Sequence, residues 1–223
     1  MKLWLVRKQA DILCLQEFFD DPFNPVFSNV ADLRQHGGYH CYFAANPTYK
    51  EGRNTGIAIF SRYPMINKGE IFNENGFNRA IFADIVVHTD TFRIINAHLH
   101  SMQLGEQRTL QAYLQRIARG AAIRTGQSRL LLQFVASSPY PVVLCGDFND
   151  MPGSYVYRQF SQHLKDAFTE TGQGFGGTLN HPLLFFLRID QQFCSPGLRP
   201  LRYSVHRELK ASDHFPVEVE YGW

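Results

Sequence analysis

With 223 residues and a hydrophobic content of 44%, the chain can bury a sizeable core, as one large domain or two small ones. Charged residues make up 19% of the chain, and the formal net charge is only +2. A balance this close to neutral excludes the strong overall basic charge that would indicate nucleic-acid binding from composition alone.

The four cysteines are scattered along the chain, without CxxC or zinc-finger spacing. Cys14 and Cys145 lie inside apolar, strand-like runs, which is typical of buried free thiols rather than of disulfides or metal ligands. Free thiols favour a reducing compartment. Because no signal peptide or membrane span is visible, we expect a cytoplasmic location, unless an anchor or signal lies upstream of this sequence.

The beginning of the chain predicts a helix and then a buried strand. Residues 1–9 have a helix-like apolar pattern, and residues 12–15 form a continuous apolar run of the kind found in strands covered on both faces. Glu17 follows this run. A carboxylate at the end of a buried strand is costly unless it meets a cation or hydrogen-bond donors, so Glu17 is a candidate ligand. The alternative is an ordinary surface glutamate.

The next segment, residues 20–54, is rich in Pro, Asn and Gly and predicts a long loop with one short helix near residues 26–34. Substrate-binding loops tend to lie in such segments. A strand is predicted over residues 55–62, and Pro64 ends it.

Two alternating runs, residues 77–87 and 91–99, predict a β-hairpin. His98 lies near the end of the second strand. A histidine at this place is either a hydrogen-bonded structural residue or a functional one, and the strand alone does not decide between them.

A long helix is predicted over residues 104–136, bent or divided at Gly120 and Gly126. Its expected apolar face comprises Leu110, Leu114, Ile117 and Ala121. A helix of this length between strands indicates a crossover that packs on a sheet.

The strand after this helix, residues 142–145, is short and apolar, and Gly146 follows it. Asp147 and Asn149 come next. Side chains at positions i and i+2 of an extended chain point to the same side, so both should project from the end of the strand. Two oxygen-bearing groups there suit a hard cation or a phosphate. The alternative is a turn in which Asp147 caps the following segment.

The remaining chain predicts a short helix over residues 155–163 and strands over residues 187–194, 203–206 and 217–221. Asp190 lies on the first of these strands, and Asp213 and His214 lie just before the last. Since no internal repeat, low-complexity run or linker is visible, we expect one domain over residues 1–223.

Seven groups therefore stand at or beside strand ends: Glu17, His98, Asp147, Asn149, Asp190, Asp213 and His214. Six phrases, five of which contain these groups, occur in this order: Leu-Gln-Glu, Gly-Ile-Ala-Ile-Phe-Ser-Arg, Asn-Ala-His-Leu, Gly-Asp-Phe-Asn, Arg-Ile-Asp and Ser-Asp-His-Phe-Pro. This combination resembles the endonuclease/exonuclease/phosphatase superfamily, with its deoxyribonuclease I-like fold, over nearly the whole chain. The implied fold is a four-layer α/β/β/α sandwich of two mixed β-sheets with outer helices.

The resemblance implies a role for each acidic residue near the metal and the water. Glu17 looks like the main Mg²⁺ ligand, with Mn²⁺ as the alternative ion, and Asp213 looks like a second carboxylate near the metal. Asp147 and Asn149 look like the pair that orients the attacking water and the phosphate.

The two histidines complete the implied machinery. His214 looks like the base or phosphate-contacting histidine, with Asp190 as its carboxylate partner, and His98 looks like the group that stabilises the phosphorane. This set suits phosphoester hydrolysis, which needs an activated water and neutralisation of growing negative charge. The protein is thus expected to be a metal-dependent phosphoric ester hydrolase.

Two departures from the family pattern bear on this expectation. Members normally begin with a strand that bears an asparagine beside the metal, whereas this chain begins after it, so we expect an N-terminally truncated domain without that strand. Gln191 stands where many relatives have an aromatic residue. The phrase around His98 is similar to the branch of deoxyribonuclease I and neutral sphingomyelinases rather than of exonuclease III, and other features resemble bacterial members.

The substrate class stays open among nucleic acids, phospholipid head groups and small phosphoesters. Asn54, Arg62 and Arg79 are candidate substrate-binding residues, although each arginine is also typical of a solvated surface cation. A monomer without an obligate protein partner is expected. Alternatives are a catalytically inactive binding or scaffold module of the same fold, and a zinc site that uses His98 and His100.

Overall fold

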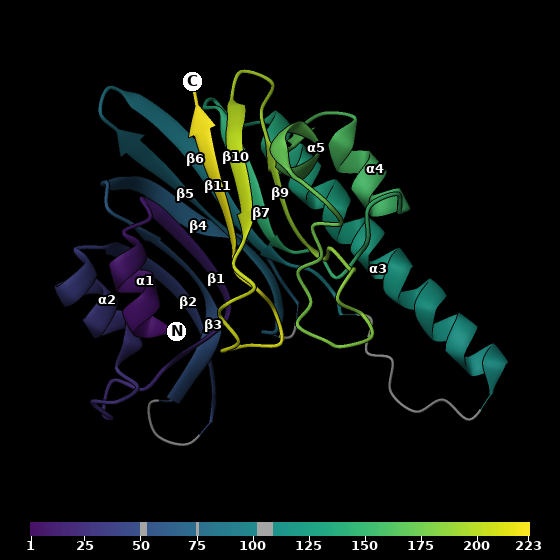
Figure 1. Ribbon diagram of the computed structural model, residues 1–223, viewed down its shortest axis with the longest axis horizontal. Helices are drawn as coiled ribbons and strands as arrows, with labels where there is room; N and C mark the ends of the chain where they lie inside the picture. The colour runs from purple at the N-terminus through teal and green to yellow at the C-terminus, as the bar shows by residue number, and fades with distance from the viewer. Residues whose placement is uncertain (50–52, 75, 102–108) are drawn as a thin grey trace. The chain divides into compact units, whose positions relative to one another are not determined.

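The computed structural model describes residues 1–49, 53–74, 76–101 and 109–223 (Figure 1). The chain forms two compact units that interleave in sequence. Unit 1 comprises residues 1–98 and 140–146, and unit 2 comprises residues 99–139 and 147–223. Both units combine helices with β-strands, so the predicted α/β class is confirmed. No described helix combines the length and the apolar character needed to cross a membrane.

Unit 1 contains an antiparallel three-stranded sheet with two helices on it. The strand order is β1-β3-β2, and the bounds are β1 Ile12–Asp20, β2 His40–Tyr49 and β3 Arg53–Ser61. The helices α1 (Lys2–Lys8) and α2 (Asn29–Gly37) lie side by side, at the purple end of the chain in Figure 1. One apolar cluster joins helices and sheet: Leu5, Leu13, Leu33, Tyr39, Ala58 and Phe60.

Strand β2 corrects the prediction of a loop over residues 20–54. The short helix inside that segment is present, but it lies a few residues later than predicted, at Asn29–Gly37. β2 was not predicted because its residues show no strict alternation of apolar and polar side chains. Pairing with β3 on one side, rather than its own pattern, makes this segment a strand.

The second group of strands in unit 1 has the order β4-β5-β6-β7. Their bounds are β4 Met65–Glu74, β5 Asn78–Val87, β6 Asp90–His98 and β7 Val142–Asp147. The predicted hairpin is confirmed as β5 and β6, and the predicted strand after the long helix is confirmed as β7. β4 was not predicted, since its many polar residues suit the outermost strand of the order and hide its period.

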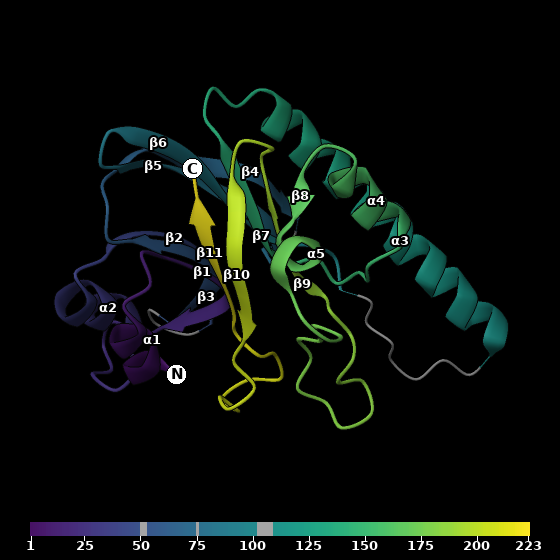
Figure 2. The same cartoon turned by 45° about the horizontal axis from the view of Figure 1, so that its top comes forward.

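The described residues of unit 2 form three helices and two antiparallel strand pairs. The helices are α3 Leu110–Ala136, α4 Tyr155–Ser161 and α5 Ala167–Thr171. The pairs are β8 Lys165–Asp166 with β9 Asp190–Cys194, and β10 Arg199–Val205 with β11 Val217–Gly222. Figure 2 shows α4 lying along α3. The strands predicted in this part of the chain are confirmed, with small shifts in their bounds.

The long helix differs from its prediction in two respects. Residues 104–108, its predicted start, lie outside the described residues, and from Leu110 it runs as one α-helix through Gly120 and Gly126 without division. Gly120 is buried, and a Cβ atom there would stand 3.3 Å from a guanidinium nitrogen of Arg124. Gly120 therefore makes room for a side chain rather than breaking the helix.

Candidate active site

Three residues of unit 2 that are far apart in the sequence converge on one point: Asp147, Asp190 and His214. Each offers a side-chain ligand atom, and these atoms all lie within 4.8 Å of one another. Asp147 ends β7, and Asp190 begins β9. A short antiparallel bridge between Leu179 and His214 holds the histidine just before β11. The structure thus brings three of the sequence-predicted site residues together.

His214 and Asp190 form a hydrogen-bonded pair. Nδ1 of His214 lies 2.8 Å from Oδ2 of Asp190, and 26% and 16% of the two side chains are exposed. Because the carboxylate engages Nδ1, it fixes the ring orientation and leaves Nε2 as the nitrogen that can serve a further partner.

The charge environment of His214 favours its protonated form. Burial lowers the pKa of the imidazole, but the hydrogen bond and charge of Asp190, with the charges of Asp147 and Asp213, outweigh burial and raise the pKa from 6.5 to about 9. At neutral pH the ring is therefore a cation held among carboxylates. Asp213 itself is exposed and lies beside this group as its sequence neighbour.

Asp147 and Asn149 form a tight turn in which Asn149 donates a hydrogen bond to each carboxylate oxygen of Asp147. The backbone N–H of Asn149 donates to Oδ1 of Asp147 at 2.8 Å, and Nδ2 of Asn149 donates to Oδ2 at 3.0 Å. Asn149 has φ 48°, a left-handed conformation that asparagine tolerates. The predicted turn capped by Asp147 is therefore present, and the same carboxylate lies near His214.

The residues on either side of Asp147 fix where its carboxylate points. Gly146 has φ 144°, and a Cβ atom there would stand 1.9 Å from the carbonyl oxygen of Ala97. The backbone N–H of Phe148 donates to the carbonyl of Ile189 at 2.9 Å, and the Phe148 ring is buried. A glycine before Asp147 and a buried aromatic residue after it thus position this turn.

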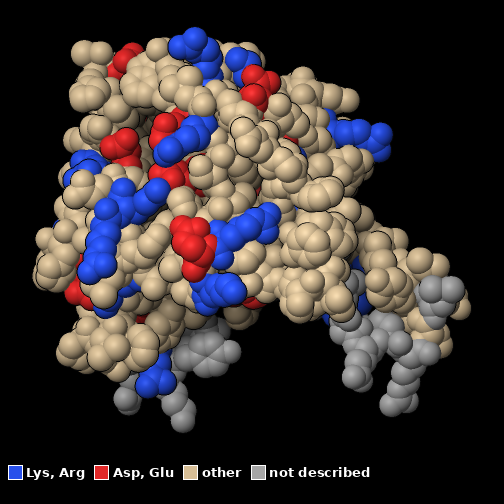
Figure 3. Space-filling model, viewed as in Figure 1, with Lys and Arg blue, Asp and Glu red and all other residues tan. Residues whose placement is uncertain are grey.

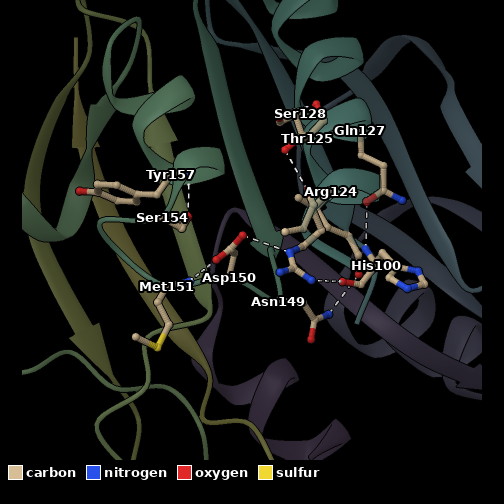
Figure 4. Close-up of polar contacts among 12 residues, drawn as sticks. His100, Arg124, Thr125, Gln127, Ser128, Asn149, Asp150, Met151, Ser154 and Tyr157 are labelled. Atoms are coloured by element: carbon tan, nitrogen blue, oxygen red, sulfur yellow. Dashed lines mark hydrogen bonds and ion pairs between the residues drawn. The ribbon is translucent and has the colours of Figure 1, made fainter. Parts of the chain in front are cut away.

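Arg124 of α3 reaches this turn from the helix, as Figure 4 shows. Its Nε donates to Oδ2 of Asp150 at 3.0 Å, and its Nη1 donates to the carbonyl of His100 at 3.2 Å. Asn149 Nδ2 donates to the neighbouring carbonyl of Leu99 at 3.1 Å. One guanidinium therefore ties together the segment after β6 and the segment after β7.

Two buried glutamines complete this support. Oε1 of Gln127, one turn after Arg124 on α3, accepts from the backbone N–H of His100 at 2.9 Å (Figure 4). Nε2 of Gln191 donates to the carbonyl of Asp150 at 2.7 Å. Gln191, the expected departure behind Asp190, thus serves as a hydrogen-bond donor to the loop that follows Asn149.

Sequence reasoning did not identify Arg124 or Gln127, although a signal was present. The predicted apolar face of α3 is wrong in its first turns, where Leu114 and Ile117 are 56% and 37% exposed. The buried stripe comprises five residues, of which Arg124, Gln127 and Ser128 are polar and Gly120 and Leu131 are not. An arginine and a glutamine at helical spacing between small and apolar residues indicate a buried polar network.

In unit 1, Glu17 and His98 lie close to each other. Oε1 of Glu17 is 3.9 Å from Nε2 of His98, and the glutamate side chain is 82% exposed whereas the histidine side chain is 9% exposed. Glu17 has φ 48°, and the register of β1 with β3 shifts between Leu15 and Phe18. This β-bulge takes Glu17 out of the ladder and turns its side chain outward.

Asn96, on β6, stabilises this bulge. It is fully buried, and its Nδ2 donates to the carbonyls of Leu15 and Ala58 at 3.2 and 2.9 Å. Nε2 of Gln16 donates to Oδ1 of Asn96 at 2.5 Å. The Gln-Glu and Asn-Ala-His phrases are thus joined by the hydrogen bond between Gln16 and Asn96. Glu17 and His98 lie beside this bond, 3.9 Å apart.

The three candidate substrate-binding residues occupy different surroundings in unit 1. Asn54 pairs with Asp20 at one end of β3, and exposed Arg62 follows the other end of that strand, where its N–H donates to the carbonyl of Asp11. In the pairing of β1 with β3, Glu17 lies opposite the middle of β3, between the positions of Asn54 and Arg62. Arg62 is therefore not retained in the proposed site.

Arg79 is 5% exposed and already engaged within the protein. Its Nη atoms donate to the carbonyl of Ala44 at 2.5 Å and to Oδ1 of Asn46 at 2.8 Å, and its Nε lies 2.8 Å from Oε2 of Glu70. It stands opposite His98 in the hairpin. We therefore assign Arg79 a supporting place beside His98 rather than a substrate contact.

Comparison with known proteins places these features in context. A family model described as the endonuclease/exonuclease/phosphatase family matches residues 2–214. Nocturnin of Xenopus laevis is 26% identical over 181 residues, which cover 70% of this chain and 40% of nocturnin. Protein angel homolog 2 of Danio rerio is 29% identical over 164 residues, covering 69% of this chain and 27% of that protein. The chain therefore spans less than half the length of these relatives.

Solved structures share the fold. The mannosyl-6-phosphatase Bt3783 of Bacteroides thetaiotaomicron matches with a TM-score of 0.66 and 20% identity, covering 100% of this chain and 89% of that one. At this identity the likeness supports the deoxyribonuclease I-like α/β fold with mixed sheets, which the sequence predicted.

Proposed function

Because the chain belongs to the endonuclease/exonuclease/phosphatase family, whose members hydrolyse phosphoesters, we propose that it is a metal-dependent phosphoric ester hydrolase. The observation that carries the proposal is the convergence of Asp147, Asp190 and His214 within 4.8 Å. A carboxylate–histidine pair with a strongly shifted pKa is typical of catalytic sites, and a binding module of the same fold has no need of one.

A divalent cation, when bound, would supply the Lewis acid that neutralises charge on the phosphate. The exposed carboxylate of Glu17, turned out of β1 by its bulge, fits such an ion, because Mg²⁺ prefers oxygen ligands. We keep Glu17 as the main ligand, Asp213 as the second carboxylate, and Mn²⁺ as the alternative ion. A zinc site on His98 and His100 fits less well, since the surrounding donors are mostly oxygen atoms.

His214 is assigned the phosphate-contacting role of the two that the family resemblance implies. Its raised pKa keeps the ring protonated at neutral pH, so Nε2 donates a hydrogen bond to a phosphate oxygen and adds positive charge where negative charge grows. Asp190 holds the ring by Nδ1 and stabilises its charge.

Asp147 is assigned the orientation of the attacking water. Its carboxylate is held rigidly by the two donors of Asn149 and is 7% exposed, so it can accept a hydrogen bond from a water in one geometry. Asn149 serves mainly to fix Asp147, and His98 is kept as the second histidine that stabilises the developing phosphorane.

The charge distribution bears on the substrate class. On the face shown in Figure 3, acidic and basic side chains are interspersed over a mostly uncharged surface, in keeping with the net charge of +2. A protein that follows a nucleic-acid backbone needs clustered cations, so this distribution favours recognition of a single phosphoester group over tracking of a long polyanion.

The proposal is tested with bis-p-nitrophenyl phosphate and p-nitrophenyl phosphate, each assayed with Mg²⁺, Mn²⁺ and a chelator. We expect divalent-dependent release of nitrophenol, and a loss of at least about a thousandfold in Asp147→Ala. Asp11→Asn, at an exposed acid that precedes β1, is the matched control and should retain full rate. An Asp147→Ala protein with near wild-type rate would refute the assignment, and a folded wild-type protein inactive on both esters would favour the scaffold alternative.

A further inference from the structure

Unit 2 carries an exposed apolar loop beside His214. We call residues 181–187 the apolar loop, which is green and precedes β9 in Figure 2. Its Leu183, Leu184, Phe185 and Phe186 are 76%, 36%, 51% and 46% exposed. Single exposed apolar residues are normal on protein surfaces, whereas four in succession mark an interaction site.

The apolar loop has a defined shape. Its neck is closed by the backbone N–H of Thr178, which donates to the carbonyl of Leu187 at 2.8 Å. Gly177 packs directly under the tip, where a Cβ atom would stand 2.0 Å from the carbonyl oxygen of Phe185. Nη2 of Arg207 donates to the carbonyl of Gly177 at 2.8 Å. The exposed side chains therefore stand on a hydrogen-bonded base rather than on an unsupported segment.

Asn180, the residue just before the apolar loop, is hydrogen-bonded to the segment that carries His214. The backbone N–H of Asn180 donates to the carbonyl of Asp213 at 2.6 Å, and its Nδ2 donates to the carbonyl of Ser212 at 2.9 Å. The bridge between Leu179 and His214 is the next contact along. A partner that binds the apolar loop is therefore held next to the imidazole.

We propose that the apolar loop docks the protein on a phospholipid surface, so that the site acts on phosphoesters of lipid head groups. This inference rests on the proposed function for its chemistry. Because no polar residue interrupts the four exposed apolar ones, the tip offers a continuous apolar segment, as suits insertion among acyl chains.

The charges at the base of the loop suit the same partner. Arg207 and Lys210 are exposed on the segment that is hydrogen-bonded to the loop, where lipid phosphates would lie above an inserted tip. Two exposed acids share this segment, Glu208, which is hydrogen-bonded to His206 at 2.9 Å, and Asp213, so the two cations act locally and not through a net positive charge.

Two other occupants are less well matched. The rings of Phe185 and Phe186 stand at 87° with centroids 5.9 Å apart, so they do not form the parallel platform on which successive nucleobases stack, and leucines add no stacking surface. A second copy of the chain needs about 800 Å² from each partner for a stable dimer, far more than the tip of one loop offers.

The test is flotation of the full chain with vesicles of phosphatidylcholine, with and without phosphatidylserine. We expect the wild type to float with the vesicles. The double variant Leu183→Ser, Phe185→Ser should partition to vesicles at least about tenfold less, because two apolar side chains no longer insert. Leu201→Ser, at a residue 55% exposed on β10, is the matched control and should float like wild type. Turnover of bis-p-nitrophenyl phosphate should be equal in all three proteins.

Wild type that stays with the lipid-free fraction would overturn the proposal, as would a double variant that floats unchanged. It would also be overturned if the double variant instead lost binding to a single-stranded oligonucleotide, or changed from dimer to monomer in light scattering. Flotation without turnover of the nitrophenyl ester would support docking and count only against the proposed hydrolase, so the two failures are distinguishable.

Discussion

The side chain of Arg124 is bound to that of Asp150, with Nε and Oδ2 3.0 Å apart, and only 4% and 14% of the two side chains are exposed. Arg124 lies on α3, and Asp150 follows the turn that holds Asp147 and Asn149. Since the guanidinium also binds the carbonyl of His100, it is a positioning residue for that turn. The helix therefore sets the geometry of residues that it does not itself contain.

Replacing Arg124 by methionine should lower the free energy of unfolding by about 3 kcal/mol, because Asp150 loses its partner while it remains mostly buried. We also expect kcat to fall with little change in KM, since Asp147 becomes less well placed while phosphate contacts persist. Denaturant unfolding and steady-state kinetics measure the two effects. Arg129→Met, at an exposed position of the same helix, is the control and should change neither.

The double variant Arg124→Met, Asp150→Asn separates charge from geometry. Removing the stranded carboxylate should restore part of the lost stability but not kcat, because the link to the carbonyl of His100 is still missing. Full recovery of kcat in the double variant would contradict a positioning role for Arg124.

Several elements could be predicted from sequence because their information is local. The hairpin β5–β6 shows its alternation and turn in one stretch, and Gly-Asp-Phe-Asn identifies its turn by composition. β2 and β4 could not be predicted, because they become strands through pairing with β3 and β5 rather than through their own pattern.

The candidate site shows the same division. The residue types at the strand ends were visible, whereas the positive φ of Glu17, the buried contacts of Arg79 and the reach of Arg124 depend on neighbours distant in sequence. Arg79 illustrates the consequence: an arginine in a strand suggests a phosphate contact until Ala44 and Asn46 are seen to engage it.

Gly146→Ala should be among the most damaging substitutions in the chain. Its Cβ would stand 1.9 Å from the carbonyl oxygen of Ala97, and its φ of 144° disfavours any side chain. We expect a loss of more than about 3 kcal/mol in unfolding free energy. Gly197→Ala is the control, because its Cβ would meet no atom within 4 Å. Equal stabilities of the two variants in urea unfolding would refute the steric argument.

The titration of His214 should depend on Asp190. In the metal-free protein the imidazole pKa of about 9 should fall toward 6.5 in Asp190→Asn, because the hydrogen bond and the adjacent charge that raise it are removed. NMR titration of the ring protons measures the shift. Asp213→Asn, which removes a smaller contribution, should lower the pKa less; equal effects of both variants would contradict the pairing.

The same pair should make stability pH-dependent in a stated direction. A histidine whose pKa is raised from 6.5 to about 9 on folding stabilises the folded state fully below pH 6.5, and this stabilisation is lost as the pH rises through about 9. The melting temperature of wild type should therefore exceed that of Asp190→Asn most at low pH within this window, and the difference should narrow toward pH 9. A difference that widens with pH would show that His214 is not the group responsible.

Glu17 should govern metal affinity without governing the fold. Its carboxylate is 82% exposed and is displaced from the β1 ladder, so Glu17→Gln should leave the melting temperature within about 2 °C of wild type. Because Glu17 is the proposed main ligand, Glu17→Gln should nevertheless weaken Mg²⁺ binding by at least about tenfold, since an amide replaces a charged oxygen ligand of a hard cation. Calorimetry measures this affinity. Asp11→Asn, six positions earlier in the chain and also exposed, should bind Mg²⁺ like wild type. If Glu17→Gln bound Mg²⁺ unchanged while Asp190→Asn lost it, the ion would belong with His214 and Asp147, and Glu17 would not be the main ligand.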